Sequence, residues 1–418
     1  MAGDPSAPAS PMPLAGLRVL DLSRVLAGPW ASQILGDLGA EVVKVEHPDR
    51  GDDTRAWGPP FLDPGDPNSP SAYYLSCNRN KKSVAIDIAT PAGARLIRSL
   101  AREADIILEN FKVGGLAKYG LDYASLRSEK ADLIYCSITG FGQTGPYASR
   151  AGYDFLIQGM GGLMSITGQP AGTPGAEPMK VGVAVSDLFT GLYATIAILA
   201  ALRHRDATGQ GQYIDCALLD TQASVLANQA MNWLVGGQRP QPLGNKHPNV
   251  VPYQTFATHD GHVIVATGND GQFQALCRLL DRPDLAEDPR YSTSAGRQVH
   301  RGALEPALAE TIRTWRSADF MRGMEANGIP GGPINTIPEV FSDPQIQARG
   351  VVRQMHLPDG SPIPTIAFPA VLSATPATYR RPPPSLGQDT RDVLSGWAGL
   401  AETELAVLEA EGVIHAPR

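Results

Sequence analysis

Three carboxylates near the middle of the chain have settings in which a side chain could do chemistry. Asp187 is predicted to follow a short β run and to stand at the start of a helix, where unpaired backbone N–H groups favour an anion. Gly191 and Ala194 lie one and two turns further on, so the helix face beside Asp187 carries little side-chain bulk. A carboxylate with open space beside it could act as the nucleophile of a covalent mechanism.

The other two carboxylates are Asp154 and Glu177. Asp154 precedes a predicted helix start at Phe155, whereas Glu177 lies in a Gly- and Pro-rich run, 168–178, that would leave it solvated. For Asp154 and Asp187 the alternative role is that of a helix cap, a position that aspartate often fills. The residues alone therefore leave two candidate aspartates.

Other covalent mechanisms have less support in the sequence. It contains no Gly-x-Ser-x-Gly motif, in which a serine would be the nucleophile. The cysteines are far apart and lack both metal-ligand spacing and the context of a nucleophile, so they are interpreted as core residues: Cys77, Cys136, Cys216 and Cys277. A carboxylate nucleophile is the better option.

Alternating strands and helices must position these carboxylates. Strands are predicted at 17–22, 41–46, 83–88, 105–110 and 133–138, with helices at 30–38 and 92–103. Strand–helix–strand units build a parallel sheet with helices on its faces, and ligands bind at the carboxyl ends of its strands. The first turn, 23–29, holds one glycine where a dinucleotide site needs three, so NAD is not expected.

The pattern of predicted strands and helices changes at about Thr221. A β-hairpin is predicted across 253–267, followed by helices at 272–280, 302–312 and 317–327, which together suggest a smaller α+β domain. The expected organisation is a flexible N-terminus at 1–13, a large domain at 14–222 and 329–418, and a small domain at 223–328.

Composition narrows the class of protein. Of the 418 residues 43% are hydrophobic and 18% are charged, which is ordinary for a soluble chain with a sizeable core. The net charge of −7 gives no support for binding nucleic acid or a membrane surface. The N-terminus lacks an apolar signal region, and the longest apolar stretch, 194–202, is too short to span a bilayer. A cytoplasmic enzyme is expected.

A series of short motifs resembles one family over about 13–413. The strings lie at 21–29, 39–46, 51–55, 80–83, 109–111, 137–146, 186–191, 208–212 and 328–333. In this order they resemble the class III CoA-transferases, the family of formyl-CoA transferase and carnitine CoA-transferase. The strings at 251–256 and 268–273 resemble the subgroup that moves CoA between dicarboxylates, the succinate–hydroxymethylglutarate type.

The resemblance implies a fold, partners and a reaction. The fold would be α/β, with a Rossmann-like parallel sheet in the large domain, an inserted smaller α+β domain and an interlocked homodimer. CoA, as acyl-CoA, and a small carboxylic acid would be substrates, with no permanently bound cofactor and no metal. The family's catalytic aspartate falls at Asp187 rather than Asp154. It would form a mixed anhydride with the acyl group and then a thioester with CoA.

The resemblance also implies binding residues. Those for CoA are Leu26, Ala27, His47, Ile86, Asn110, Phe111, Lys112, Lys118 and Tyr119. His47 occupies a position that the family often fills with arginine. The substrate pocket would include Trp57, Tyr73 and Tyr153, and Arg24 and His247 are the candidates for holding a distal carboxylate.

Two alternatives remain. Acyl-CoA racemases share the fold, but their catalytic histidine falls at Tyr153, and a tyrosine with an ordinary pKa of about 10 is a poor base at neutral pH. A protein that holds acyl-CoA without turning it over would be expected to carry a damaged Asp187 segment, and the segment is intact.

Overall fold

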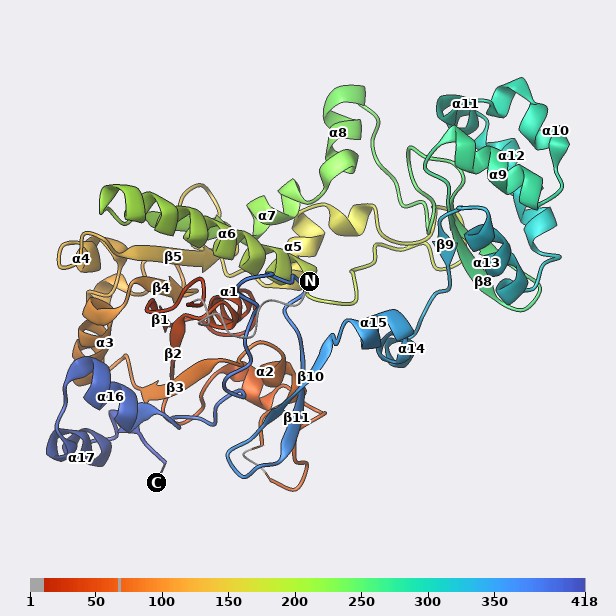
Figure 1. The fold of residues 1–418 in the computed structure, drawn as a ribbon. Coiled ribbons are helices and arrows are strands. Elements are labelled where there is room, and N and C mark those ends of the chain that lie inside the picture. The colour runs from red at the N-terminus through yellow and green to blue at the C-terminus, as the bar shows by residue number, and fades with distance from the viewer. Residues whose placement is uncertain (1–10, 67–68, 418) are drawn as a thin grey trace. The chain divides into compact units, whose positions relative to one another are not determined.

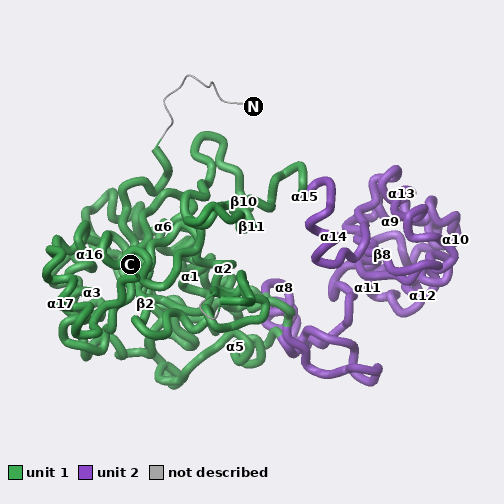
Figure 2. Tube along the Cα trace, turned by 90° about the horizontal axis from the view of Figure 1, so that it is seen from below, with its two compact units in different colours: residues 1–163, 181–226, 347–418 green, residues 164–180, 227–346 purple. Residues whose placement is uncertain are grey.

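The computed structural model describes residues 11–66 and 69–417. Of the N-terminus predicted to be flexible, 1–13, residues 1–10 lie outside this described part. The chain forms two compact units (Figure 2): the first comprises 1–163, 181–226 and 347–418, and the second 164–180 and 227–346. Segments 164–180 and 329–346, which were predicted in the large domain, group with the second unit, and 223–226 groups with the first.

A seven-stranded sheet forms the centre of the first unit, with strand order β12-β3-β2-β1-β4-β5-β6. All neighbours pair in parallel except β12 and β3. The order 3-2-1-4-5-6 is that of a doubly wound sheet, whose ligand crevice lies where β1 meets β4. The strands are β1 (Arg18–Asp21), β2 (Glu41–Glu46), β3 (Lys81–Ile86), β4 (Ile106–Glu109), β5 (Ile134–Thr139), β6 (Tyr213–Ala217) and β12 (Ile414–His415).

Both faces of this sheet are buried, because successive side chains of a strand point to opposite sides. Val19 and Ile106 pack in one core with α1 and α6, whereas Leu20 and Ile107 pack in the other with α3, α16 and α17 (Figure 1). The helices of the first unit are α1 (Ala27–Asp37), α2 (Ala72–Ser76), α3 (Pro91–Glu103), α4 (Tyr123–Arg127), α5 (Asp154–Met160), α6 (Val185–Thr208), α7 (Leu218–Ser224), α16 (Thr390–Ala398) and α17 (Glu402–Ala410).

An antiparallel hairpin of β10 (Val352–His356) and β11 (Pro362–Ile366) also belongs to the first unit. The short 3-10 turns of this unit are η1 (Asp53–Ala56) and η2 (Ala117–Tyr119), and η3 (Leu163–Ser165) begins at its last residue before the second unit. Helix α15 (Pro344–Ala348) spans the boundary between the two units.

The second unit has a core of its own, around an antiparallel sheet ordered β7-β8-β9. Its first two strands form the hairpin predicted across 253–267. Its elements are α8 (Ala227–Gly236), β7 (Tyr253–Ala257), β8 (His262–Ala266), α9 (Asp270–Leu279), α10 (Pro283–Glu287), η4 (Pro289–Tyr291), α11 (Ser294–Val299), α12 (Arg301–Ile312), α13 (Ser317–Ala326), β9 (Gly331–Gly332) and α14 (Ile337–Ser342).

The parallel α/β fold was predicted and is confirmed, but two local predictions were wrong. The β run before Asp187 does not form: 181–184 is irregular and α6 begins at Val185. The stretch around 194–202 belongs to a helix of 24 residues, which is long and apolar enough to cross a membrane by length and composition. One face of α6 is buried in the first unit, beside α1, β5 and β6, as expected of a core helix.

Candidate active site

Asp187 lies in the first turn of α6, and its side chain is largely buried, with the residue 9% exposed. The residue before the helix, Ala184, has no side chain able to cap it. The cap comes instead from α5, where Asp154 Oδ1 accepts hydrogen bonds from the backbone N–H of Ser186 (2.7 Å) and of Asp187 (3.4 Å). The two candidate aspartates therefore have different roles: Asp154 caps α6, and the Asp187 carboxylate remains available.

Further bonds fix the start of α6. Gln158 Nε2 donates to Asp154 Oδ2 at 2.7 Å, while Gln158 Oε1 accepts from the N–H of Val181 at 2.9 Å. The Ser186 hydroxyl donates to Gln222 Oε1 at 2.7 Å. Helices α5 and α7 thus hold the turn that carries Asp187.

The charge state of Asp187 follows from this setting. Burial raises the pKa of its carboxyl, and the neighbouring Asp154 charge raises it further, to about 7. In the described residues, 11–66 and 69–417, the structure gives the Asp187 carboxylate no hydrogen-bond donor. A carboxylate that is poorly solvated and more basic than usual is a better nucleophile than one at the surface.

Gly191, one turn after Asp187, sets the contact between α6 and α1. A Cβ at this position would lie 2.6 Å from the Ala27 carbonyl oxygen and 3.2 Å from the Trp30 side chain. Only glycine lets the two helices approach so closely. The open helix face inferred from the sequence is therefore filled at Gly191 by the start of α1, which includes the predicted CoA residues Leu26 and Ala27.

Aromatic side chains lie near the carboxylate. The rings of Trp57 and Tyr73 pack edge to face, with centroids 5.3 Å apart. Burial, and after it the charge of Asp187, raises the pKa of the Tyr73 hydroxyl, so Tyr73 is close enough to Asp187 to interact with its charge. Tyr153 directly precedes α5 and is 60% exposed. The structure brings these three predicted residues to the unit that holds Asp187.

A cavity of about 160 Å³ lies at the carboxyl ends of β1, β2 and β3. Of the predicted residues, its lining includes Arg24, His47, Ile86 and Phe111. Five polar residues that the sequence analysis did not single out also line it: Ser23, Lys44, Glu46, Arg50 and Asp52. A signal for two of them was present, since Arg50 and Asp52 lie in the loop after the predicted strand 41–46.

Other predicted CoA residues lie in the segment after β4. Asn110 exchanges two hydrogen bonds with the backbone of Arg24: its Oδ1 accepts from the Arg24 N–H at 3.0 Å and its Nδ2 donates to the Arg24 carbonyl at 2.7 Å. Lys112 is exposed, and Lys118 Nζ lies 4.6 Å from the ring centroid of Tyr119. Asn110 thus ties the first loop to β4.

Comparison with known proteins decides the family. The model of "CoA-transferase family III" matches residues 14–390. A succinate–glutarate CoA-transferase of Agrobacterium fabrum is 53% identical over 384 residues, covering 92% of this chain and 95% of that protein. A succinyl-CoA:glutarate CoA-transferase of Mus musculus is 44% identical over 404 residues, covering 96% and 90%. This chain belongs to CoA-transferase family III.

The fold agrees with this assignment. The crystal structure of a CAIB/BAIF family protein from Brucella suis matches with a TM-score of 0.80 and 49% identity, over 93% of this chain and all of that one. The protein is therefore an enzyme that transfers CoA between an acyl-CoA and a carboxylic acid, as predicted. In the described part of the chain no group of three or more His, Cys, Asp or Glu side chains could hold a metal ion.

The two residues predicted to hold a distal carboxylate belong to different units. Arg24 is in the first unit, where it forms an ion pair with Asp53 at 3.0 Å. His247 is in the second, and its Nδ1 accepts from the N–H groups of Asn249 and Val250, both at 3.0 Å. The proton of a neutral His247 is then on Nε2, where it can be donated to a ligand.

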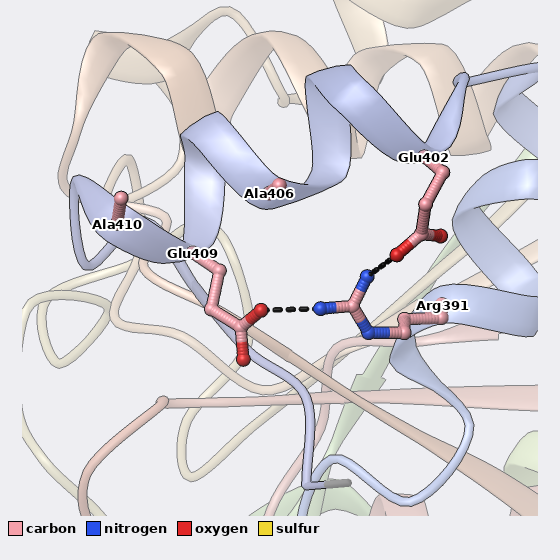
Figure 3. A pocket seen from close by; sticks show the side chains of 5 residues that line it. All are labelled: Arg391, Glu402, Ala406, Glu409 and Ala410. Atoms are coloured by element: carbon pink, nitrogen blue, oxygen red, sulfur yellow. Dashed lines mark hydrogen bonds and ion pairs between the residues drawn. The ribbon is translucent and has the colours of Figure 1, made fainter.

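A larger hollow of this CoA-transferase, about 630 Å³, lies at α16 and α17. Arg391 pairs there with Glu402 and Glu409, which leaves the arginine occupied by two carboxylates (Figure 3). Its other lining residues are alanines, Ala406 and Ala410. This hollow offers no nucleophile, and it shares no residue with the site around Asp187.

Proposed function

We propose that this CoA-transferase exchanges CoA between dicarboxylic acids of the size of succinate and glutarate, through a covalent intermediate on Asp187. The relatives named for succinate and glutarate support the substrate class. The observation that carries the mechanism is the buried carboxylate of Asp187, with its pKa raised to about 7 and its helix N-terminus capped by another residue.

The reaction proceeds by four acyl transfers. The Asp187 carboxylate attacks the thioester carbonyl of the donor, the C–S bond breaks, and a mixed anhydride and CoA thiolate result. The thiolate attacks the Asp187 carbonyl of the anhydride, which releases the donor acid and leaves CoA on Asp187 as a thioester. The acceptor carboxylate attacks this thioester and expels the thiolate again. The thiolate then attacks the acceptor's carbonyl, which forms the new acyl-CoA and regenerates the Asp187 carboxylate.

The chain's own groups serve this sequence in three ways. Burial of Asp187 keeps water from the anhydride and the thioester, both of which hydrolyse readily. The first N–H groups of α1, at Ala27 and Gly28, can stabilise the oxyanions, since helix N-termini favour negative charge. His47 and Arg50 line the cavity and suit the phosphates of CoA.

Binding roles are part of the same proposal. CoA would contact the start of α1 and the segments after β2, β3 and β4, through the residues predicted for it. Trp57, Tyr73 and Tyr153 would line the acyl pocket, and Arg24 and His247 would hold the distal carboxylate. Nothing in the site favours a racemase, because Tyr153 stands where a base would be needed.

The assembly and location are proposed too. The smaller domain would be an insertion and two chains would interlock. Contact with a second chain is supported by an apolar stripe on α6 that the first unit leaves exposed: Phe189, Leu192, Tyr193, Ile196 and Leu199. A dimer that covered this stripe would explain an apolar helix face on a cytoplasmic protein.

The mechanism is tested by trapping. With succinyl-CoA as donor and glutarate as acceptor, D187N should lose CoA exchange by a factor of about a thousand or more, since no covalent path remains. Hydroxylamine should convert Asp187 of the wild-type enzyme to a hydroxamate, located by mass spectrometry. D154N, which keeps an oxygen for the Ser186 N–H, is the matched control and should retain exchange. A hydroxamate on Asp154, or exchange by D187N, would overturn the assignment.

A further inference from the structure

The loop between β1 and α1, residues 22–26, contains a strained residue. Val25 has a φ of 73°, in the left-handed region that β-branched side chains rarely adopt. Such a conformation persists only where surrounding groups hold it. The loop leads directly into Leu26 and Ala27, so its shape determines where their backbone lies.

A buried ion pair, Lys44 with Asp52, forms hydrogen bonds with this loop at two points. Both carboxylate oxygens of Asp52 accept from the Val25 N–H at 3.2 Å. Lys44 Nζ donates to the Ser23 carbonyl at 2.8 Å and to Asp52 Oδ2 at 2.8 Å. The pair therefore holds the carbonyl of Ser23 and the N–H of Val25, on either side of Arg24, whose backbone Asn110 holds.

Both members of the pair are charged and enclosed, with side chains 0% exposed. Burial alone would raise the pKa of Asp52, but the Lys44 charge and bonds from Thr54 outweigh it and lower the pKa to about 2. Desolvating an ion pair costs about as much as its attraction returns, so stability is a weak reason for this pair. Its contacts with the loop supply a stronger one.

We propose that Lys44 and Asp52 are a positioning pair, which holds Val25 in its left-handed conformation and so sets the backbone of Leu26 and Ala27 for binding CoA. The inference rests on the proposed function, which assigns that backbone to CoA. Neither side chain acts on the reacting atoms. Their effect is on the affinity for CoA, through the conformation of the loop.

The test removes the pair without leaving a buried charge. Replacing Asp52 alone would strand the Lys44 ammonium and could unfold the protein, and asparagine would keep an oxygen for the Val25 N–H, so the variant used is the apolar pair K44M/D52L. Calorimetry with free CoA measures the dissociation constant, and a thermal melt checks the fold. We expect the dissociation constant to rise about tenfold, the size of effect that one strained residue carries.

A rescue separates positioning from a structural role. Glycine adopts a φ of 73° without strain, so adding V25G to K44M/D52L should tighten CoA binding again. In the wild-type background V25G should give no such gain, because the ion pair already holds the conformation. If V25G changes the affinity equally in both backgrounds, or if K44M/D52L binds CoA like the wild type, the positioning role is wrong.

The matched control is R79M/D37L, which removes another buried ion pair of the first unit. Arg79 Nη2 donates to Asp37 Oδ2 at 2.6 Å, and in the described residues the other side-chain hydrogen bonds of the two are with Thr365 and Asn80, outside 22–26. We expect its stability to change while its dissociation constant for CoA does not. Failure of the Asp187 mechanism would be distinguishable, because it would appear in D187N turnover and leave these CoA affinities as they are.

Discussion

At Asp187 two effects oppose the usual behaviour of a carboxyl group at a helix N-terminus. The helix would favour the ionised form, but burial and then the Asp154 charge raise the pKa to about 7. The α6 N–H groups that would stabilise the anion are shared with Asp154, which accepts from two of them. Helix α6 thus positions the proposed nucleophile while doing little to stabilise its charge.

The dependence of kcat/KM on pH should reflect the pKa of Asp187 and its interaction with Asp154. Below the pKa Asp187 is protonated and cannot attack, so kcat/KM should fall as the pH drops through about 7. D154N removes the second of the two causes, so the midpoint should move to lower pH by about half a unit to one unit, while burial keeps it above the ordinary value. The measurement is kcat/KM for succinyl-CoA between pH 5 and 9.

Titration of one other group, Glu109, would produce the same fall of kcat/KM at low pH. Burial raises the pKa of Glu109 to about 7, and its Oε2 accepts from the Phe111 N–H at 2.7 Å, in the segment proposed for CoA. If Glu109 controls the profile, D154N will leave the midpoint unchanged and E109Q will move it. That result would contradict the role given to the Asp154 charge.

The sequence predicted the positions of the two aspartates but not their contacts. Spacing singled out Asp187 and Asp154 as residues at helix starts, and both observations are correct. Which helix Asp154 caps was not predictable, because the cap joins two helices that are separated by residues 161–184: α5 ends at Met160 and α6 begins at Val185. The positive φ of Val25 was equally hidden, since a β-branched residue gives no signal for it.

Among the elements, buried parallel strands were the easiest to predict. The β run at 41–46 coincides with β2, where three valines, Val42, Val43 and Val45, supply the β-branched signal of a strand although the other three residues are charged. The alternation Val181, Val183 and Val185 predicted a strand wrongly, since Val183 is 57% exposed and has no partner strand in the described sheet. Strand β6 was missed because its first three residues, Tyr213 to Asp215, are partly or fully exposed, which leaves only Cys216 and Ala217 as a buried apolar signal.

The contact of α6 with α1 gives a prediction at the scale of elements. G191A places a methyl group 2.6 Å from the Ala27 carbonyl oxygen, so the helices must separate. We expect a loss of about 1 to 3 kcal/mol of stability and a drop in kcat, because α1 and Asp187 move apart. Denaturant unfolding and steady-state exchange measure the two effects.

The matched control is G396A in α16, another helical glycine of the first unit, where a Cβ would have nothing within 4 Å. Alanine there should leave kcat unchanged and stabilise the protein by about 0.5 to 1 kcal/mol, since it lowers the entropy of the unfolded chain. Equal kinetics for G191A and G396A would show that the close approach at Gly191 has no part in catalysis.

At the scale of the whole molecule, the two units each bury a core, yet α6 keeps an apolar stripe exposed beside the buried face that carries Asp187. On the proposed assembly, α6 would have one face for the first unit and one for a partner chain. The proposed second chain fits this arrangement, because it would complete the surroundings of the helix that holds the nucleophile.

The proposed dimer predicts the effect of a charge placed in this stripe. Ile196, in the middle of the stripe and 60% exposed, would be buried in a dimer, so I196K should shift the protein from dimer to monomer and lower its exchange activity. V407K in α17, at a residue 55% exposed, introduces the same charge away from the stripe and should leave the dimer intact. Light scattering after size exclusion measures the mass.

Interlocking adds a requirement that an ordinary dimer lacks. Chains that thread one another can part only by unfolding, so a tagged and an untagged dimer mixed in native buffer should form no hybrid over days, whereas unfolding and refolding the mixture together should form hybrids in the statistical proportion. Native mass spectrometry distinguishes the species. Hybrids that appear in native buffer without unfolding would leave the dimer possible but rule out threading, and would limit the stripe on α6 to a face-to-face contact.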